Sequence, residues 1–269
     1  MAKSRPRRHS KEFMTSSNPD VDDESEDSDV DAIKKPAGGR GNREPHPRTE
    51  APRPALQKLA PTKLRIIAGE MRGRKIPYNG DPAIRPMKER TRESVFSLLG
   101  GYLTNTFAID LFGGTGILAI ESVSRGADGG VVFELSRPAV STIVETLKLL
   151  KLEQLIEVHN IDTLRWMRSI ESNVRSWPNI PWMIYCCPPY RMWTDHKERL
   201  LAGISELFAI SPPGSKLICE TEHDFDMATE MPDLVWDIRK YQPAFIAIAT
   251  KPAIDSEASE ESEASEVSE

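Results

Sequence analysis

The stretch that decides the fold runs from Phe107 to Ile120 and reads FAIDLFGGTGILAI. Its first part, Phe107 to Phe112, is an apolar run of strand length, and glycines follow it directly. Glycines let the backbone turn sharply and approach a ligand closely. Asp110 near the strand's end places a carboxylate at the carboxyl edge of a sheet. The stretch therefore predicts a strand, a tight turn and a helix, with a ligand site at the turn.

Working outward from this stretch, strand-length runs alternate with helical patterns. The five predicted strands are Phe107 to Phe112, Gly130 to Leu135, Ile156 to Asn160, Trp182 to Cys187 and Ser215 to Glu220. The predicted helices between them are Ile117 to Arg125, Pro138 to Leu150, Thr163 to Ile170 and His196 to Phe208. Such alternation indicates an α/β fold in which helices cover both faces of a parallel sheet.

The end of the pattern breaks this alternation. Leu234 to Tyr241 and Ala244 to Thr250 are two further strand-like runs with only two residues between them. That spacing allows a hairpin and leaves no room for a crossover helix. We therefore predict a Rossmann-like, seven-stranded, mostly parallel sheet with one antiparallel strand.

Composition divides the rest of the chain. We expect residues 1–62 to be a disordered tail rich in proline and charge, and residues 252–269 to be a disordered acidic Ser/Glu tail. Between them we expect a small basic N-terminal extension at 63–100, with a strand from Leu64 to Gly69 and a helix from Glu89 to Leu99, and a main domain at 101–251. The last 18 residues hold seven acidic and no basic side chains, so the net charge of −6 belongs mainly to a tail.

Several classes of protein are disfavoured. No apolar run approaches the length of a membrane helix, and the basic start lacks the apolar core of a signal peptide. Three cysteines and five histidines show no zinc-site spacing, so we expect no metal. We expect a soluble, cytoplasmic protein.

Carboxylates stand at three successive strand ends. Asp110 ends the first strand, Glu134 ends the second, and Asp162 follows the third. Glu134 could accept both hydroxyls of a ribose, and Asp162 could accept from an adenine amine. A nucleoside without phosphate suits all three, although they could also be simple loop caps. The pattern Gly114-x-Gly116-x-x-Ala119 also allows a dinucleotide site, but a carboxylate beside it would repel a pyrophosphate.

The fourth strand ends in Cys187-Pro188-Pro189-Tyr190. Two prolines fix the backbone and remove two donors, which leaves neighbouring carbonyls free to accept hydrogen bonds. The aromatic ring that follows could stack on a flat base. A proline-rich loop with a packed tyrosine is the alternative interpretation.

These motifs together resemble class I S-adenosylmethionine-dependent methyltransferases, in the branch that methylates exocyclic amines of nucleic-acid bases. The N-terminal extension adds four motifs: Leu64-Arg-Ile-Ile-Ala-Gly69, Arg72-Gly-Arg-Lys75, Ile84-Arg-Pro86 and Arg90-Thr-Arg-Glu-Ser-Val-Phe96. With them the chain resembles the RsmD family of bacterial 16S ribosomal RNA guanine-N2 methyltransferases over residues 64–250. The resemblance implies direct methyl transfer from S-adenosylmethionine, with no metal and no covalent enzyme intermediate. It also implies that small-subunit ribosomal RNA or the assembling subunit is the partner, and we expect a monomer.

The resemblance assigns roles to residues. The expected cofactor contacts are Asp110, Phe112, Gly114, Gly116, Glu134 and Asp162. The expected catalytic loop is Cys187, Pro188, Pro189 and Tyr190, in which the Pro188 carbonyl and the Tyr190 ring would hold the base. The expected RNA contacts are Arg65, Arg72, Arg74, Lys75, Arg85, Arg90 and Arg92, of which we expect about half to be structural.

Cys187 departs from the family pattern, which has Asp or Asn before the prolines. A protonated thiol is a weak acceptor for the N–H of the target amine. Slow catalysis, catalysis by a thiolate, or a protein that binds RNA for ribosome assembly without transferring methyl are all compatible with Cys187. A DNA amine methyltransferase and a dinucleotide-dependent oxidoreductase are the remaining alternatives. Gly113, where the family more often has Ala, is expected only to loosen the turn.

Overall fold

The computed structural model describes residues 60–253 of the chain. The two predicted tails, 1–62 and 252–269, lie outside the described residues apart from positions 60–62 and 252–253. The main sheet contains β3 (Phe107–Asp110), β4 (Gly129–Glu134), β5 (Ile156–Asn160), β6 (Trp182–Cys186), β7 (Lys216–Glu222), β8 (Trp236–Tyr241) and β9 (Ala244–Thr250).

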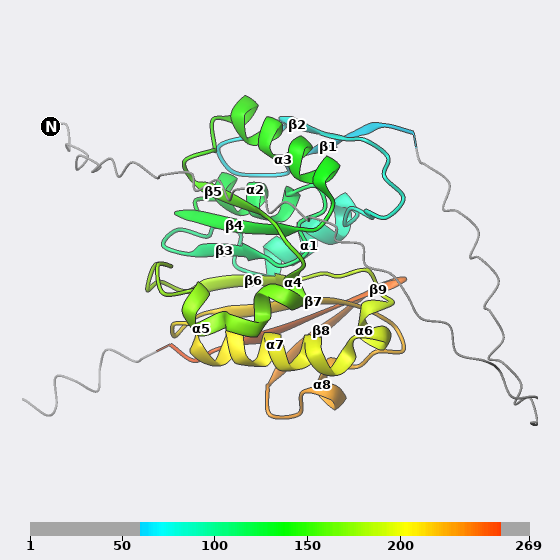
Figure 1. The fold of residues 1–269 in the computed structure, drawn as a ribbon, viewed down its shortest axis with the longest axis vertical. Coiled ribbons are helices and arrows are strands. Elements are labelled where there is room, and N and C mark those ends of the chain that lie inside the picture. Colours follow the sequence, from blue (N-terminus) through cyan, green and yellow to red (C-terminus); the bar gives the residue numbers. More distant parts are fainter. Residues whose placement is uncertain (1–59, 254–269) are drawn as a thin grey trace, which may run out of the picture. The chain divides into compact units, whose positions relative to one another are not determined.

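The order of strands across the sheet is β5-β4-β3-β6-β7-β9-β8 (Figure 1). Only β9 runs against its neighbours, since it pairs antiparallel with both β7 and β8 while the other pairs are parallel. The predicted seven-stranded sheet with one antiparallel strand is therefore confirmed. From β3 the chain builds β4 and β5 on one side and then returns to build β6 on the other. This reversal makes a topological switch point between β3 and β6, where ligands of such sheets bind.

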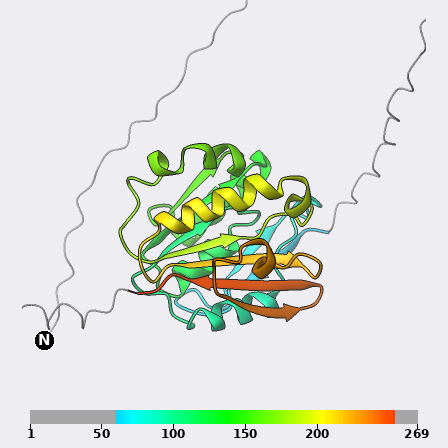
Figure 2. The same cartoon turned by 90° about the horizontal axis from the view of Figure 1, so that it is seen from below.

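Helices cover both faces of the sheet, as predicted. One set is α1 (Glu89–Leu98), α2 (Ile117–Ser124) and α3 (Arg137–Leu150). The other set is α4 (Thr163–Trp166), the 3-10 turn η1 (Met167–Ser169), α5 (Ile170–Asn173), α6 (Met192–Asp195), α7 (Lys197–Ile210) and α8 (Met227–Glu230). Figure 2 shows α7, in yellow, lying across one face. The predicted single helix from Thr163 to Ile170 is broken because Ser169 leaves the helical conformation, with φ −144°.

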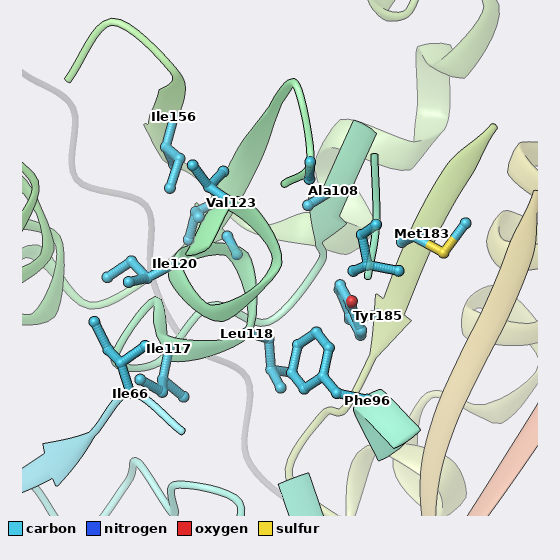
Figure 3. Close-up of a cluster of buried hydrophobic side chains, with 14 of the residues drawn as sticks. Ile66, Phe96, Ala108, Ile117, Leu118, Ile120, Val123, Ile156, Met183 and Tyr185 are labelled. Atoms are coloured by element: carbon cyan, nitrogen blue, oxygen red, sulfur yellow. The ribbon is translucent and has the colours of Figure 1, made fainter. Parts of the chain in front are cut away.

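Alternate residues of each central strand enter two separate hydrophobic cores. In β3, Ala108 belongs to the core under α1 to α3, whereas Ile109 belongs to the core under α4 to α8. In β6, Met183 and Tyr185 face the first core, and Ile184 faces the second. Figure 3 shows the side chains of the first core gathered around α2. This two-sided burial explains why the strand sequences are continuously apolar.

The N-terminal extension shares the first core. Its strands β1 (Thr62–Arg65) and β2 (Lys75–Tyr78) form a separate antiparallel pair. The sequence predicted one strand here, from Leu64 to Gly69, and missed β2, which is short and contains a proline. Ile66 and Phe96 pack with the side chains of α2 in the first core (Figure 3).

Glu121 of α2 attaches the extension to the sheet domain. Its side chain is fully buried and accepts hydrogen bonds from the Ile67 amide at 2.9 Å and the Ala68 amide at 3.0 Å. The Arg125 Nε lies 3.1 Å from its Oε1, and the Arg92 Nε lies 3.8 Å from its Oε2. The carboxylate is thus neutralised and bonded where it is buried, as a stable buried charge requires. Among residues 60–253 no helix is both long and apolar enough to span a membrane.

Candidate active site

A cavity of about 600 Å³ lies at the carboxyl ends of the parallel strands, across the switch point. Its wall is built from the segments that follow β3, β4, β5 and β6, from one residue of β7, and from a loop of the extension. These parts are residues 112–115 with Ile117 and Leu118, residues 133–136 and 162–164, residues 187–192 with Asp195 and His196, Glu220, and residues 83–87. The volume is in the range of small-molecule sites.

Glu134 lines the cavity at the end of β4. Its Oε2 accepts from the Gly114 amide at 2.7 Å, and its Oε1 accepts from the Ser136 amide at 2.6 Å. Burial raises the pKa of Glu134, and these amide hydrogen bonds partly oppose that rise. The carboxylate is therefore held in a fixed position between the first glycine turn and the start of α3.

Asp162 lies on the same cavity wall and caps α4. Its Oδ1 accepts from the Leu164 amide at 2.8 Å. The cap interpretation therefore applies to Asp162, and it does not conflict with a ligand contact because the residue is exposed.

Asp110 is buried behind the cavity wall and does not line it. Its side chain is 1% exposed, and neither carboxylate oxygen has a hydrogen-bond partner of normal geometry among the described residues. Burial raises the pKa of Asp110 to about 7; the nearby Phe112 amide opposes this rise, and the charge of Glu134 adds to it. Asp110 does not line the cavity, so the prediction that it contacts the cofactor directly is not met in this structure.

The three glycines of the turn have different roles. Gly114 lines the cavity with φ +55°, and an added Cβ would lie 3.1 Å from Cγ2 of Ile84 in the extension. Gly116 is outside the cavity wall; its φ is +72°, and an added Cβ would lie 3.1 Å from Cγ2 of Ile143. Gly113 does more than loosen the turn, because a Cβ there would lie 2.2 Å from Cγ1 of Val132. Glycine at 113 makes room for that side chain.

The loop after β6 brings all four of its predicted residues, Cys187 to Tyr190, to the cavity. The Tyr190 hydroxyl donates to Oε1 of Glu220 at 3.1 Å, which fixes the ring in place. Glu220 belongs to β7, and the Trp193 Nε1 donates to its backbone carbonyl at 2.9 Å. Glu220 was not among the site residues predicted from the sequence, although it ends a predicted strand as Glu134 does.

Cys187 is a neutral thiol at ordinary pH. Burial raises its pKa well above the usual range, and the negative charges of Glu220 and Asp110 raise it further. The pKa of Glu220 is also raised by burial, while the hydrogen bond from Tyr190 and the charge of Arg85 oppose that rise. The structure therefore disfavours a thiolate at position 187.

The seven predicted RNA contacts differ in their surroundings: one lies on the cavity rim, three are exposed, two are exposed but paired, and one is buried. Arg85 lies on the cavity rim, and the exposed side chains of Arg72, Lys75 and Arg90 are available to a partner. Arg65 pairs with Glu89, and Nη2 of Arg74 donates to the Leu149 carbonyl at 3.1 Å; both arginines stay exposed.

Arg92 corrects the prediction. It is 1% exposed, pairs with Glu121, and donates to the backbone carbonyls of Met87 at 3.1 Å and Arg65 at 2.7 Å. Its guanidinium is part of the core and cannot reach a phosphate in this structure.

Comparison with known proteins identifies the family. The family model described as conserved hypothetical protein 95 matches residues 64–245, more than half of the chain. A Buchnera aphidicola protein named ribosomal RNA small subunit methyltransferase D is 32% identical over 130 residues, covering 48% of this chain and 64% of that protein. The protein of the same name from Escherichia coli is 36% identical over 89 residues, covering 33% of this chain and 45% of that protein. The chain belongs to the RsmD family. Each alignment spans less than two thirds of the relative's own length.

The fold of this RsmD-family chain agrees with that membership. The structure superposes on the solved structure of a protein titled putative methyltransferase YhhF from Escherichia coli with a TM-score of 0.58 and 21% sequence identity. The match covers 72% of this chain and 100% of the YhhF chain. The predicted class I methyltransferase fold is confirmed. Within residues 60–253, no group of three or more His, Cys, Asp or Glu side chains is arranged to hold a metal ion.

Proposed function

We propose that this protein transfers a methyl group from S-adenosylmethionine to the N2 amine of a guanine in small-subunit ribosomal RNA, in the cytoplasm. The observation that carries the proposal is that one cavity joins Glu134 with the Cys187 to Tyr190 loop. A carboxylate suited to a ribose and an aromatic loop suited to a base thus share one chamber. Family membership and the relatives named ribosomal RNA small subunit methyltransferase D support methyl transfer and the same class of RNA.

The residues present fit the cofactor. The Asp110 carboxylate is buried without a hydrogen-bond partner, which a nearby cation would compensate. Glu134 would hold the ribose hydroxyls, and Asp162 would accept from the adenine amine. Gly114 would let the methionine part lie against the backbone. When bound, S-adenosylmethionine supplies an electrophilic methyl group.

The other residues of the cavity would bind and orient the RNA base. The Tyr190 ring, held by Glu220, would stack on the guanine, and the Pro188 carbonyl would accept from its amine. Arg85 at the rim would contact a phosphate of the same strand. Loop residues 83–87 would exclude water from one side of the cavity.

The neutral Cys187 thiol supports a second candidate, a protein that binds RNA during ribosome assembly and transfers no methyl. A DNA amine is the alternative substrate, because the chemistry of the site does not distinguish the polymer. Both alternatives keep the cofactor cavity. They differ from the proposal only in the polymer bound or in the absence of the transfer step.

The decisive experiment measures methyl transfer from labelled S-adenosylmethionine to small ribosomal subunits from cells lacking this gene. The wild-type protein is compared with Asp110→Ala and Cys187→Asp, and duplex DNA serves as the competing substrate. Transfer to the subunits that is lost in Asp110→Ala supports the proposal. If only Cys187→Asp transfers methyl groups, the natural protein is the assembly factor that binds RNA without transferring methyl. If methyl groups are transferred only to DNA, the substrate is a DNA amine.

A further inference from the structure

We propose that Glu220 supplies the hydrogen-bond acceptor for the target amine that Cys187 does not supply. The inference rests on the function proposed above and deepens it by naming the group that receives the amine proton. It starts from a conflict at the site. An exocyclic amine needs an acceptor to draw its lone pair out of conjugation, yet the residue before the two prolines is a thiol.

The first supporting observation is the position of Glu220. Its β7 strand runs parallel to β6, with Cys186 and Cys219 in register, so Glu220 of β7 lies beside Cys187, the first residue after β6. Both residues line the same cavity. The two side chains are close enough for the charge of Glu220 to raise the pKa of the Cys187 thiol. A carboxylate at position 220 is therefore next to the place where the family has its acceptor.

The second observation is that a hydrogen bond orients the Glu220 carboxylate through one of its two oxygens only. Its Oε1 accepts from the Tyr190 hydroxyl, while its Oε2 accepts no hydrogen bond from the described residues. Because Tyr190 is the ring expected to stack on the base, the same contact places the carboxylate beside the stacked base. One oxygen thus orients the ring, and the other is available to an N–H group.

The other carboxylates of the wall are less suitable. Both oxygens of Glu134 already accept from backbone amides, those of Gly114 and Ser136, and Asp162 caps α4. Asp195 lines the cavity but is exposed on α6, where water would compete for it. Glu220 is half-buried, and a charged hydrogen bond is stronger where water is scarce.

The transfer step balances in atoms and electrons. One amine N–H donates to Oε2 of Glu220, and the nitrogen lone pair forms the new C–N bond to the methyl carbon. The S–CH₃ bond breaks, and its electron pair stays on sulfur as a neutral thioether. The nitrogen then carries a positive charge, and it loses the donated proton to Glu220 and from there to solvent. No metal or redox partner is needed for this balance.

The test combines methyl transfer with nucleotide binding on the full chain. Glu220→Gln keeps the shape of the side chain and removes the charge, and Glu222→Gln, on the same strand but exposed and outside the cavity, is the matched control. We expect Glu220→Gln to lower kcat on small subunits by about 10²- to 10³-fold, as loss of a positioned polar group typically does. The KM for S-adenosylmethionine should be unchanged, and Glu222→Gln should behave as wild type.

A charge-conserving rescue separates this role from a structural one. Cys187→Asp in the Glu220→Gln background moves the carboxylate to the position where the family carries it. We expect kcat to recover by at least about tenfold relative to Glu220→Gln alone. If the double variant is no more active than Glu220→Gln, or if Glu220→Gln keeps the wild-type kcat, the inference is wrong.

Nucleotide binding gives a readout that needs no methyl transfer. With S-adenosylhomocysteine present, GMP and IMP, which lacks the N2 amine, are titrated into wild-type protein and followed by protein-detected NMR. We expect wild type to bind GMP about tenfold more tightly than IMP, and Glu220→Gln to lose that preference. A wild-type protein without the preference overturns the inference even if the variant does not fold. If wild type shows the preference but transfers no methyl group, the proposed function fails while the role of Glu220 as amine acceptor stands.

Discussion

Replacing Asp110 by asparagine should change how the stability of the protein depends on pH. Burial raises the pKa of this carboxyl from 3.8 to about 7 in the folded protein. The folded state therefore binds the proton more tightly than the unfolded chain does. The contribution of Asp110 to stability is then complete below pH 3.8 and falls as pH rises toward 7. An asparagine does not titrate, so the variant lacks this loss.

The magnitude follows from the two pKa values. A rise from 3.8 to about 7 corresponds to about 4 kcal/mol of folding free energy over that pH range. Of this, about 2 to 3 kcal/mol falls between pH 5 and pH 8. For a folded region of 150 to 250 residues, that change corresponds to about 5–10 °C in Tm. From pH 5 to pH 8, the free energy of unfolding of Asp110→Asn should therefore rise by about 2 to 3 kcal/mol relative to that of wild type. Any cost of the substitution that does not depend on pH leaves this difference unchanged.

The assay is thermal and urea unfolding of the protein without added cofactor, at pH 5 and at pH 8. Asp224→Asn, the same change at an exposed position, is the control and should show no such difference. If the difference in free energy of unfolding between Asp110→Asn and wild type is equal at the two pH values, Asp110 does not carry a raised pKa. The account of it as a buried carboxyl without a partner would then be refuted.

Three further outcomes are expected. Glu121→Gln should lower the free energy of unfolding by about 3 kcal/mol, because it leaves the buried charges of Arg92 and Arg125 uncompensated. Urea unfolding measures this loss, and a loss below about 1 kcal/mol contradicts the central role of the Glu121 carboxylate. Glu134→Gln should weaken S-adenosylhomocysteine binding by about tenfold through weaker charged hydrogen bonds; calorimetry measures it, and unchanged affinity argues against a ribose contact. Arg85→Ala should weaken RNA binding and reduce the slope of log affinity against log salt by about 1, whereas an unchanged slope in a salt titration would show that Arg85 contacts no phosphate.

The sheet was predictable from the sequence because its signals are local. The central strands of the main sheet are apolar runs, and the outer strands β5 and β8 alternate apolar with polar residues. The two residues between β8 and β9 allow only a hairpin. The carboxylates at strand ends were predictable for the same reason, since parallel strands meet at one edge. Glu134 and Asp162 accordingly lie on the cavity.

The features that the sequence did not show depend on contacts between distant residues. Glu121 binds the amides of Ile67 and Ala68, more than 50 positions earlier, and nothing near it in the sequence indicates a buried acceptor. Arg92 belongs to a basic segment by composition, yet it lies in the core because Glu121 is there. Glu220 becomes a site residue only when β7 is placed beside β6. Such pairings are set by the tertiary arrangement of elements, which local patterns do not encode.

The Glu121 contacts also limit how this protein can be divided or recombined. A related core that received residues 63–100 without a carboxylate at this point of α2 would bury two amide donors unpaired, at about 1–3 kcal/mol each. The reverse exchange would leave the carboxylate buried beside Arg125 alone. The basic extension is consequently not a portable module. Chimaeras and truncations should therefore be cut before β1, so that the N-terminal extension and α2 come from the same protein.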